Sequence, residues 1–298
     1  MTLTTTVPKE FVHRAAVAEV MLTDWQRQDD THFTVRAQWP RSHSFFTPIE
    51  GGYHDPLIVA ETIRQAATLL AHTELGVPLG HKFLMWDIKL TVNPDQLQVG
   101  NTPASLDIDV SCTELQWRRA NLAGFRCEMF MRRDGQLVAT GGGSVTCASP
   151  AVYRRVRGDH GGHQNPLPLT APAAPQNVGR MSPMDVVLSP SGEPNRWQLR
   201  VDTQHPVLFD HPQDHVPGMV LLEAARQATA AALNCSSLLP LSIVGDFQRY
   251  VELDAPCVIE ATRLSCAATT GEDTVVVTGH QEGAAVFSAT VTALRRSA

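Results

Sequence analysis

The pattern of hydrophobic and polar positions predicts two long helices that are apolar around nearly their whole circumference. The first covers about residues 56–72 and the second about residues 217–233. Apolar residues on almost every face are typical of a helix that is buried on all sides. Asp55 and Pro56 suit the start of the first helix, because an aspartate side chain accepts from free N–H groups and proline has none to satisfy.

Alternating apolar and polar positions predict strands in both halves of the chain, two before each helix and four after it. Before the first strand, residues 1–14 are expected to form a tail. Residues 24–30 are expected to form a turn, and Asp134-Gly135 a hairpin turn. The strands are expected at residues 17–22, 32–39, 82–92, 104–115, 123–132 and 137–147, and again at 185–188, 196–201, 241–253, 256–266, 274–281 and 284–294.

The two helices carry the same polar residues, which indicates an internal repeat. Each has Glu, then Arg three residues later, then Gln, and the copies are separated by 223 − 61 = 162 positions. The histidines at 43 and 205 repeat with the same offset. A buried helix followed by antiparallel-type strands is an α+β pattern, and a curved sheet wrapped around such a helix is the hotdog fold. The sequence therefore predicts tandem hotdog domains that form an intramolecular pseudo-dimer, with their sheets joined edge to edge.

The expected domains are residues 1–150 and 181–298, joined by a linker over residues 151–180. This segment is rich in proline and glycine, so we expect it to be semi-extended. Its arginines, Arg154, Arg155 and Arg157, are expected to form a solvated cluster, with phosphate binding as the alternative.

Composition excludes several classes of function. The 298 residues are 43% hydrophobic and 18% charged, with a net charge of −6 and no block of basic residues, so nucleic acid is not an expected partner. No signal peptide and no stretch of roughly 18 apolar residues is present, so no membrane association is expected. The six cysteines are scattered without a CxxC pair, which favours free thiols in the cytoplasm.

The polar residues of the helices need an explanation, because glutamate and arginine are almost never buried without partners. Glu61, Arg64 and Gln65 share one face of the first helix, as Glu223, Arg226 and Gln227 do in the second. One interpretation is an ordinary ion pair on a solvated face. The apolar surroundings and the repetition favour the other interpretation, in which the residues line a polar pocket. A desolvated glutamate there would have a raised pKa, which suits a general base.

The segment before the second helix adds further candidates. Pro217-Gly218-Met219 resembles the turn that opens the central helix of hotdog hydroxyacyl-ACP dehydratases, and His211 is nearest to their loop histidine. The N–H groups of Gly218 and Met219 are suited to hold a thioester carbonyl oxygen. The cluster also allows a metal site, although it matches none of the usual ligand spacings; its members are His205, Asp210, His211, Asp214 and His215.

The chain as a whole, the linker excepted, resembles the AfsA-type (A-factor synthase) family of γ-butyrolactone biosynthesis. The segments that carry the resemblance are Val12 to Arg14, Glu19 to Trp25, Ala37 to Arg41, Glu61 to Gln65 with His72, and Phe209 to Gln227. The resemblance implies a double-hotdog acyltransferase. Such an enzyme moves a β-ketoacyl group from an acyl carrier protein thioester to a hydroxyl of dihydroxyacetone phosphate, the first step towards a butyrolactone or butenolide signal. It also implies that Glu61, Glu223 and Arg226 are the important helix residues.

These residues suggest a division of roles. We expect Glu61 to be the general base on the acceptor hydroxyl, and Arg226, held by Glu223, to bind phosphate or polarise the ketoacyl group. Glu223 is equally suited to be the base. No metal or redox cofactor is required. The expected substrate-binding residues are Arg64, Gln65, Gln227, His211, His215, Gly218 and Met219.

Other functions and partners remain open at this stage. A dehydratase or thioesterase would consume an acyl thioester without a phosphorylated acceptor. A non-catalytic protein would bind a finished acyl signal without turnover. The acyl donor is expected to be the carrier protein thioester or acyl-CoA, and the protein is expected to be a monomeric pseudo-dimer or a higher homo-oligomer.

Overall fold

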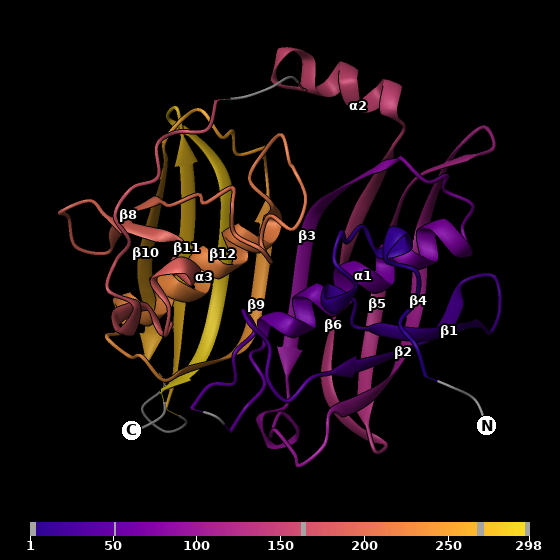
Figure 1. The fold of residues 1–298 in the computed structure, drawn as a ribbon, viewed down its shortest axis with the longest axis horizontal. Coiled ribbons are helices and arrows are strands. Elements are labelled where there is room, and N and C mark those ends of the chain that lie inside the picture. The colour runs from indigo at the N-terminus through magenta and orange to yellow at the C-terminus, as the bar shows by residue number, and fades with distance from the viewer. Residues whose placement is uncertain (1–3, 51, 162–164, 267–270, 296–298) are drawn as a thin grey trace. The chain divides into compact units, whose positions relative to one another are not determined.

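The computed structural model describes residues 4–50, 52–161, 165–266 and 271–295. The chain divides into two compact units, Met1–Gly158 and Asp159–Ala298. The division falls inside the predicted linker. Each unit contains one long helix packed against an antiparallel sheet, α1 in the first and α3 in the second (Figure 1).

The sheet of the first unit has the strand order β1-β2-β4-β5-β6-β3, and every neighbouring pair is antiparallel. Its α-helices are α1 (Leu57–Thr73) and α2 (Pro150–Arg157). Its strands are β1 (Leu22–Arg27), β2 (His32–Trp39), β3 (Lys82–Val92), β4 (Ala104–Arg118), β5 (Asn121–Arg133) and β6 (Gln136–Ala148). Short 3-10 helices are formed by Lys9–Val12, Val17–Glu19 and Pro94–Gln96.

The second unit repeats this topology, with the antiparallel order β9-β12-β11-β10-β8-β7. Read from the other end, this is the order of the first unit, so the repeat predicted from the helices extends to the whole sheet. The elements are α3 (Gly218–Ala232), β7 (Leu188–Pro190), β8 (Arg196–Leu199), β9 (Leu238–Phe247), β10 (Cys257–Cys266), β11 (Glu272–Gln281) and β12 (Ala284–Arg295). Its 3-10 helices are Gly158–Gly161, Pro175–Val178 and Pro183–Asp185.

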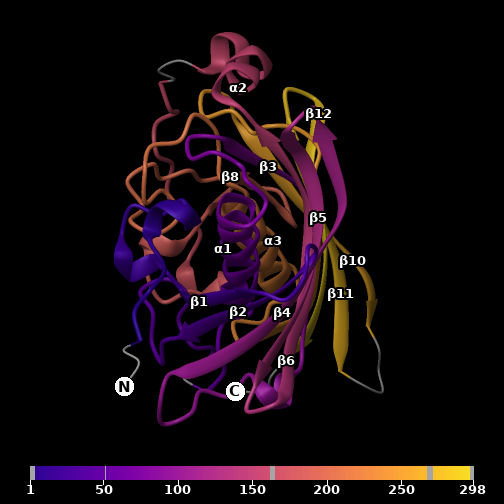
Figure 2. The same ribbon diagram turned by 90° about the vertical axis from the view of Figure 1, so that its right-hand side faces the viewer.

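Both central helices are buried on almost every side, as their apolar pattern predicts. In α1 only Arg64, His72 and Thr73 escape burial. In α3 every residue from 219 to 230 is buried. The sheet of each unit curves around its helix (Figure 2). At Gly141 of β6 an added Cβ would lie 2.5 Å from Cδ1 of Ile63, so glycine allows the strand to approach α1 closely.

The hairpin turn expected at Asp134-Gly135 is confirmed. Asp134 and Gly135 both have positive φ (51° and 77°), the combination that a two-residue hairpin turn requires. Gly76, with φ of 70°, follows the end of α1 in the left-handed conformation that favours glycine. At the other end of α1, Oδ1 of Asp55 accepts the N–H of Leu57 at 2.9 Å.

The segments before the first strand of each unit differ from the prediction. Residues 9–12 form a 3-10 helix instead of a tail, and Val12 is fully buried. Residues 17–19 form another, and the strand begins only at Leu22 and continues through part of the expected turn. In the second unit, too, a 3-10 helix precedes a later strand. Where a strand was expected, the backbone bonds instead to a glutamine of the central helix, at Glu19 and Met21 in the first unit and at Asp185 and Val187 in the second. These tertiary contacts outweigh the local strand pattern.

The predicted linker is more ordered than its composition indicates. Helix α2 occupies its first residues, and the hydroxyl of Ser149 accepts the N–H of Val152 at the helix start. Arg154 and Arg155 are exposed, but Arg157 is buried, so the interpretation of all three as a solvated cluster is wrong for Arg157. Residues 162–164 of this segment lie outside the described residues.

Two further findings concern the whole described chain. The cysteines of known state are free thiols, four of them buried and one partly exposed; the sixth, Cys266, lies where side chains are not described. None of the helices described is both long enough and apolar enough to cross a membrane.

Candidate active site

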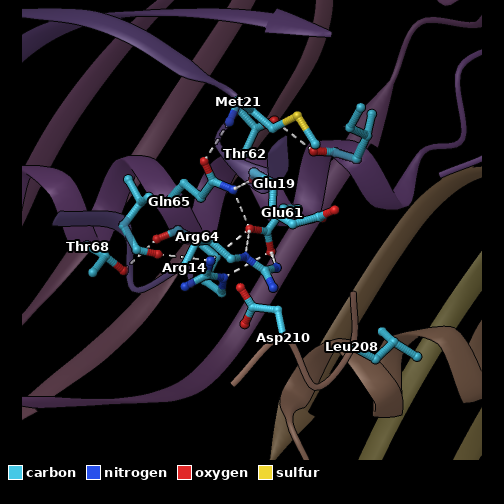
Figure 3. Close-up of polar contacts among 12 residues, drawn as sticks. Arg14, Glu19, Met21, Glu61, Thr62, Arg64, Gln65, Thr68, Leu208 and Asp210 are labelled. Carbon is cyan, nitrogen blue, oxygen red and sulfur yellow. Dashed lines mark hydrogen bonds and ion pairs between the residues drawn. The ribbon is translucent and has the colours of Figure 1, made fainter. Parts of the chain in front are cut away.

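The centre of the first unit is an ion-pair network around Glu61 on α1. Arg14 donates through Nε to Oε1 at 2.9 Å, and its Nη2 lies 2.7 Å from Oε2. Arg64 donates through Nε to Oε2 at 2.9 Å and through Nη2 to Oε1 at 2.7 Å. Figure 3 shows these bonds converging on the Glu61 carboxylate from both sides. Each arginine thus presents two nitrogens to the carboxylate, an arrangement that gives both strength and fixed geometry.

Gln65 links this network to the backbone in front of the first strand. Its Nε2 donates to Oε1 of Glu61 at 2.5 Å and to the carbonyl of Glu19 at 2.7 Å. Its Oε1 accepts the N–H of Met21 at 2.9 Å. Gln65 is fully buried, and all these bonds go to protein groups. In this geometry Gln65 positions the covering segment, the stretch of residues 9–21 before the first strand; its counterpart in the second unit is residues 175–187. The expected contact of Gln65 with substrate stays a prediction.

The second unit contains the same network around Glu223. Arg180 donates through Nε to Oε1 and through Nη2 to Oε2, both at 2.7 Å. Arg226 donates through Nε to Oε2 at 2.9 Å and through Nη2 to Oε1 at 2.7 Å. Gln227 donates to Glu223 at 2.5 Å and to the carbonyl of Asp185 at 2.8 Å, and it accepts the N–H of Val187 at 3.0 Å. Every bond around Glu61 therefore has a counterpart here.

A histidine–carboxylate pair supports each network. In the second unit the Nδ1 atom of His205 accepts the N–H groups of Val207 and Leu208, so its Nε2 carries the proton that faces Asp185 at 3.1 Å. In the first unit His43 has the same arrangement and faces Glu19 at 3.4 Å. Both ring nitrogens of each repeated histidine thus face protein groups, and the histidines anchor their loops. Among the residues described, no group of three or more His, Cys, Asp or Glu side chains is arranged to hold a metal ion.

The expectation that the helix glutamates have raised pKa values is wrong. Burial does raise the pKa of Glu61, but the charges and hydrogen bonds of Arg14 and Arg64 outweigh it and hold the pKa well below its usual range. In the same way Arg180 and Arg226 overcome burial and lower the pKa of Glu223 to about 2. Both carboxylates are therefore ionised anchors for arginine pairs. Whether either takes part in the reaction stays a prediction.

The sequence interpretation missed two residues of these networks, Arg14 and Arg180. A signal for them was present. Val12-His13-Arg14 is matched by Val178-Gly179-Arg180, but with an offset of 180 − 14 = 166 in place of the 162 that relates the helices. Arg180 is four residues closer to its helix glutamate than Arg14 is. The two arginines also lie in segments that were expected to be a tail and a linker, so the match was not recognised.

The two networks differ in their access to solvent. The side chain of Arg64 is 24% exposed, whereas that of Arg226 is 4% exposed. Both guanidinium groups use Nε for the glutamate and Nη2 for the glutamate and a backbone carbonyl, Val12 in one case and Val178 in the other. Within the described residues, Nη1 of Arg64 is left for a further acceptor.

The remaining candidates lie before and at the start of α3. His211 bonds through Nδ1 to Asp210 at 2.5 Å, and His215 through Nδ1 to Asp214 at 2.7 Å. The ring of His215 also packs edge-on against Tyr250, with centroids 4.8 Å apart. Gly218 and Met219 are the first two residues of α3, so their N–H groups have no partner inside the helix. The oxyanion role expected for these N–H groups stays a prediction.

A comparison with protein-family models assigns the chain to a family. The model of the AfsA domain, described as the A-factor biosynthesis hotdog domain, matches residues 1–149 and 162–295. The chain belongs to the AfsA family. It is 54% identical over 286 residues to the 2-oxo-3-(phosphooxy)propyl 3-oxoalkanoate synthase of Streptomyces virginiae, covering 96% of this chain and 97% of that protein. The protein of the same name from Streptomyces coelicolor is 44% identical, covering 96% and 90%.

Solved structures support the fold of this AfsA protein. An acyl-ACP thioesterase from Bacteroides thetaiotaomicron matches it with a TM-score of 0.53 at 10% identity, covering 87% of this chain and 97% of the thioesterase. The predicted tandem hotdog architecture is thereby confirmed. At this level of identity the likeness concerns the fold alone. The AfsA residues expected from the resemblance, Glu61, Glu223 and Arg226, all lie in the two buried networks.

Proposed function

We propose that this protein is a 2-oxo-3-(phosphooxy)propyl 3-oxoalkanoate synthase. The observation that carries the proposal is the 54% identity to a synthase of that name, extending over nearly the whole length of both chains. Both repeated networks lie within that matched length. The name describes the product, an ester between a β-keto acid and the hydroxyl of dihydroxyacetone phosphate. The reaction is therefore acyl transfer to that hydroxyl.

The acyl donor of this reaction is a β-ketoacyl thioester, for which we infer an acyl carrier protein as the partner. A thioester is a suitable donor because its thiolate leaves more readily than an alkoxide. The alcohol acceptor is a poor nucleophile until a base removes its proton. The protein must therefore supply a base, a group for the carbonyl oxygen and a cation for the phosphate.

For the phosphate we propose Arg64. Its side chain is the more exposed of the two helix arginines, and Glu61 fixes its guanidinium in one orientation. A guanidinium held in this way presents its remaining N–H groups to a phosphate without losing further conformational freedom. The buried Arg226 and Gln227 hold the covering segment of the second unit in place.

The test of the function is incubation with β-ketoacyl thioesters of several chain lengths and dihydroxyacetone phosphate, followed by mass spectrometry. The expected product is the phosphorylated ketoester, formed only when donor, acceptor and protein are all present. A free β-keto acid formed at the same rate without the acceptor would instead identify a thioesterase. If no donor gives an acceptor-dependent product, the proposal is wrong.

The role of Arg64 is tested with Arg64→Gln. We expect KM for dihydroxyacetone phosphate to rise by roughly 10- to 100-fold, because a charged hydrogen bond contributes about 1.5–3 kcal/mol. Unphosphorylated dihydroxyacetone should be used almost equally by wild type and variant. The matched control is Arg132→Gln, which removes an arginine that is 43% exposed and paired with Asp109 at the surface. An equal preference for phosphate in wild type and Arg64→Gln would contradict the role.

A further inference from the structure

The loop between β8 and α3 contains a carboxylate–histidine pair, Asp210 and His211. Asp210 has only 2% of its side chain exposed, whereas the adjacent His211 is 35% exposed. Their Oδ1 and Nδ1 atoms are 2.5 Å apart. A buried carboxylate fixes the imidazole from one side, and the ring reaches solvent on the other.

The protonation of His211 follows from its partners. An ionised carboxylate can only accept, so Nδ1 of His211 donates its proton to Asp210. In the neutral ring Nε2 then carries the lone pair, and it lies beside the side-chain amide of Gln213. This is the tautomer of a general base: the carboxylate holds the proton-bearing nitrogen, and the lone pair of the other nitrogen points towards a donor. An alcohol O–H is a donor that can take the place of the Gln213 amide.

The loop is held at both ends, so the pair has a fixed position within its unit. On one side, His205 accepts two loop N–H groups, and the N–H of Phe209 donates to the His205 carbonyl at 3.0 Å. On the other, the N–H of Val216 donates to the carbonyl of Val251 at 2.9 Å. A base on a rigid support is what proton transfer to a bound substrate requires.

The corresponding positions of the first unit hold no such pair. The positions displaced by 162 from Asp210 and His211 are Pro48 and Ile49. The buried networks are repeated in detail, but this pair is not, so it is not needed to build a hotdog unit. Glu223 on the neighbouring helix is already occupied by Arg180 and Arg226.

We propose that His211, oriented by Asp210, is the general base of the acyl transfer; this inference rests on the proposed function. Nε2 of His211 takes the proton of the acceptor hydroxyl as its oxygen forms a bond to the thioester carbonyl carbon. The tetrahedral intermediate then collapses, the C–S bond breaks, and the proton passes from Nε2 to the departing thiolate. The products are the ester and the free thiol of the carrier, and Nε2 of His211 is again unprotonated. His211 is a catalytic residue in this step and Asp210 a positioning residue.

The test compares His211→Ala and Asp210→Asn with wild type in the ester-forming assay. We expect His211→Ala to lower kcat by roughly 100- to 10,000-fold with little change in KM, which is the usual contribution of a general base. Added imidazole should restore part of the lost kcat. We expect Asp210→Asn to lower kcat less than His211→Ala, and Asp210→Glu to recover part of that loss. The matched control is His32→Ala, which removes an exposed histidine paired with Asp29 through Nδ1 at 2.9 Å.

Each outcome has a defined meaning. If wild type forms no ester, the proposed function fails and the role of His211 fails with it. If wild type is active and folded His211→Ala keeps kcat within about threefold of wild type, only this inference is overturned; a loss in His32→Ala as large as in His211→Ala, or a loss that imidazole does not relieve, also overturns it. If His211→Ala does not fold, His211→Asn replaces it, because its amide can still donate to Asp210 while supplying no base, and the same loss of kcat is expected.

Discussion

The networks around Glu61 and Glu223 are built from the same residue types and the same bonds, but they differ in depth. In the second unit the arginine side chains are 2% and 4% exposed, so the whole network is enclosed. In the first unit they are 7% and 24% exposed, and Arg64 reaches solvent. The second network is therefore closed to solvent, whereas the first holds the segment before its first strand and still presents a cation to solvent.

A second difference lies beside each network. The residue before Arg14 and the residue before Arg180 both have a left-handed backbone. They are His13, with φ of 51°, and Gly179, with φ of 64°. In the first unit the ring of His13 meets that of His72, with their Nε2 atoms 2.9 Å apart. In the second unit an added Cβ at Gly179 would lie 2.8 Å from the carbonyl oxygen of Ser236, so no side chain fits. Duplication preserved the backbone shape while the space around it diverged.

The largest expected change in stability comes from replacing the two helix glutamates. Glu223→Gln leaves two enclosed arginines without an anion, and we expect it to reduce the free energy of unfolding by about 3–5 kcal/mol. Glu61→Gln is expected to have a smaller effect, about 2–3 kcal/mol, because Arg64 can turn towards water. Urea denaturation of the variants measures both values.

The control for these variants is Glu128→Gln. Glu128 forms a surface pair with Lys89, with side chains 47% and 52% exposed, and its replacement should change stability by less than about 1 kcal/mol. A larger loss in Glu61→Gln than in Glu223→Gln would contradict the difference in depth between the networks.

The pH dependence of stability gives a second, smaller effect. The pKa of Glu223 falls from 4.5 to about 2 on folding, so its ionised form stabilises the protein above pH 4.5. That stabilisation is lost as the pH falls from 4.5 towards 2, with a slope of up to about 1.4 kcal/mol per pH unit for one such group. Denaturation midpoints at pH 5, 4 and 3 should fall more steeply for wild type than for Glu223→Gln. Parallel curves would show that Glu223 does not titrate in this window.

The smallest effect is expected at the left-handed positions. Gly179→Ala should destabilise the protein by about 1–2 kcal/mol, because alanine disfavours this backbone and its Cβ would meet Ser236. His13→Gly should change stability by less than about 1 kcal/mol, because the relief of the backbone offsets the lost contact with His72. Thermal unfolding of both variants checks the contrast, and equal losses would mean that the two positions are equivalent.

Elements with a strong local pattern can be predicted from the amino-acid sequence. Strands β2 and β3 have the predicted bounds, and both central helices lie within one or two residues of theirs. Apolar residues on every face require a helix to be enclosed, and the repeated spacing of Glu, Arg and Gln implies two copies of one unit. The hairpin at Asp134-Gly135 also follows from local conformational preference. The family can also be recognised from the sequence, because the segments that resemble the AfsA family lie in both halves of the chain.

The roles of the polar residues depend instead on tertiary contacts. Arg14 and Arg180 are distant in sequence from the glutamates they bind, and the segments that carry them have no strong local pattern. Their contact reverses the expected direction of the glutamate pKa shifts, because the sign depends on which charges lie within a few ångström and burial alone does not fix it. The tautomer of His211 likewise depends on the Asp210 carboxylate meeting Nδ1 of the ring. Spacing along the chain places these residues in one loop, but only the folded backbone determines which atoms meet.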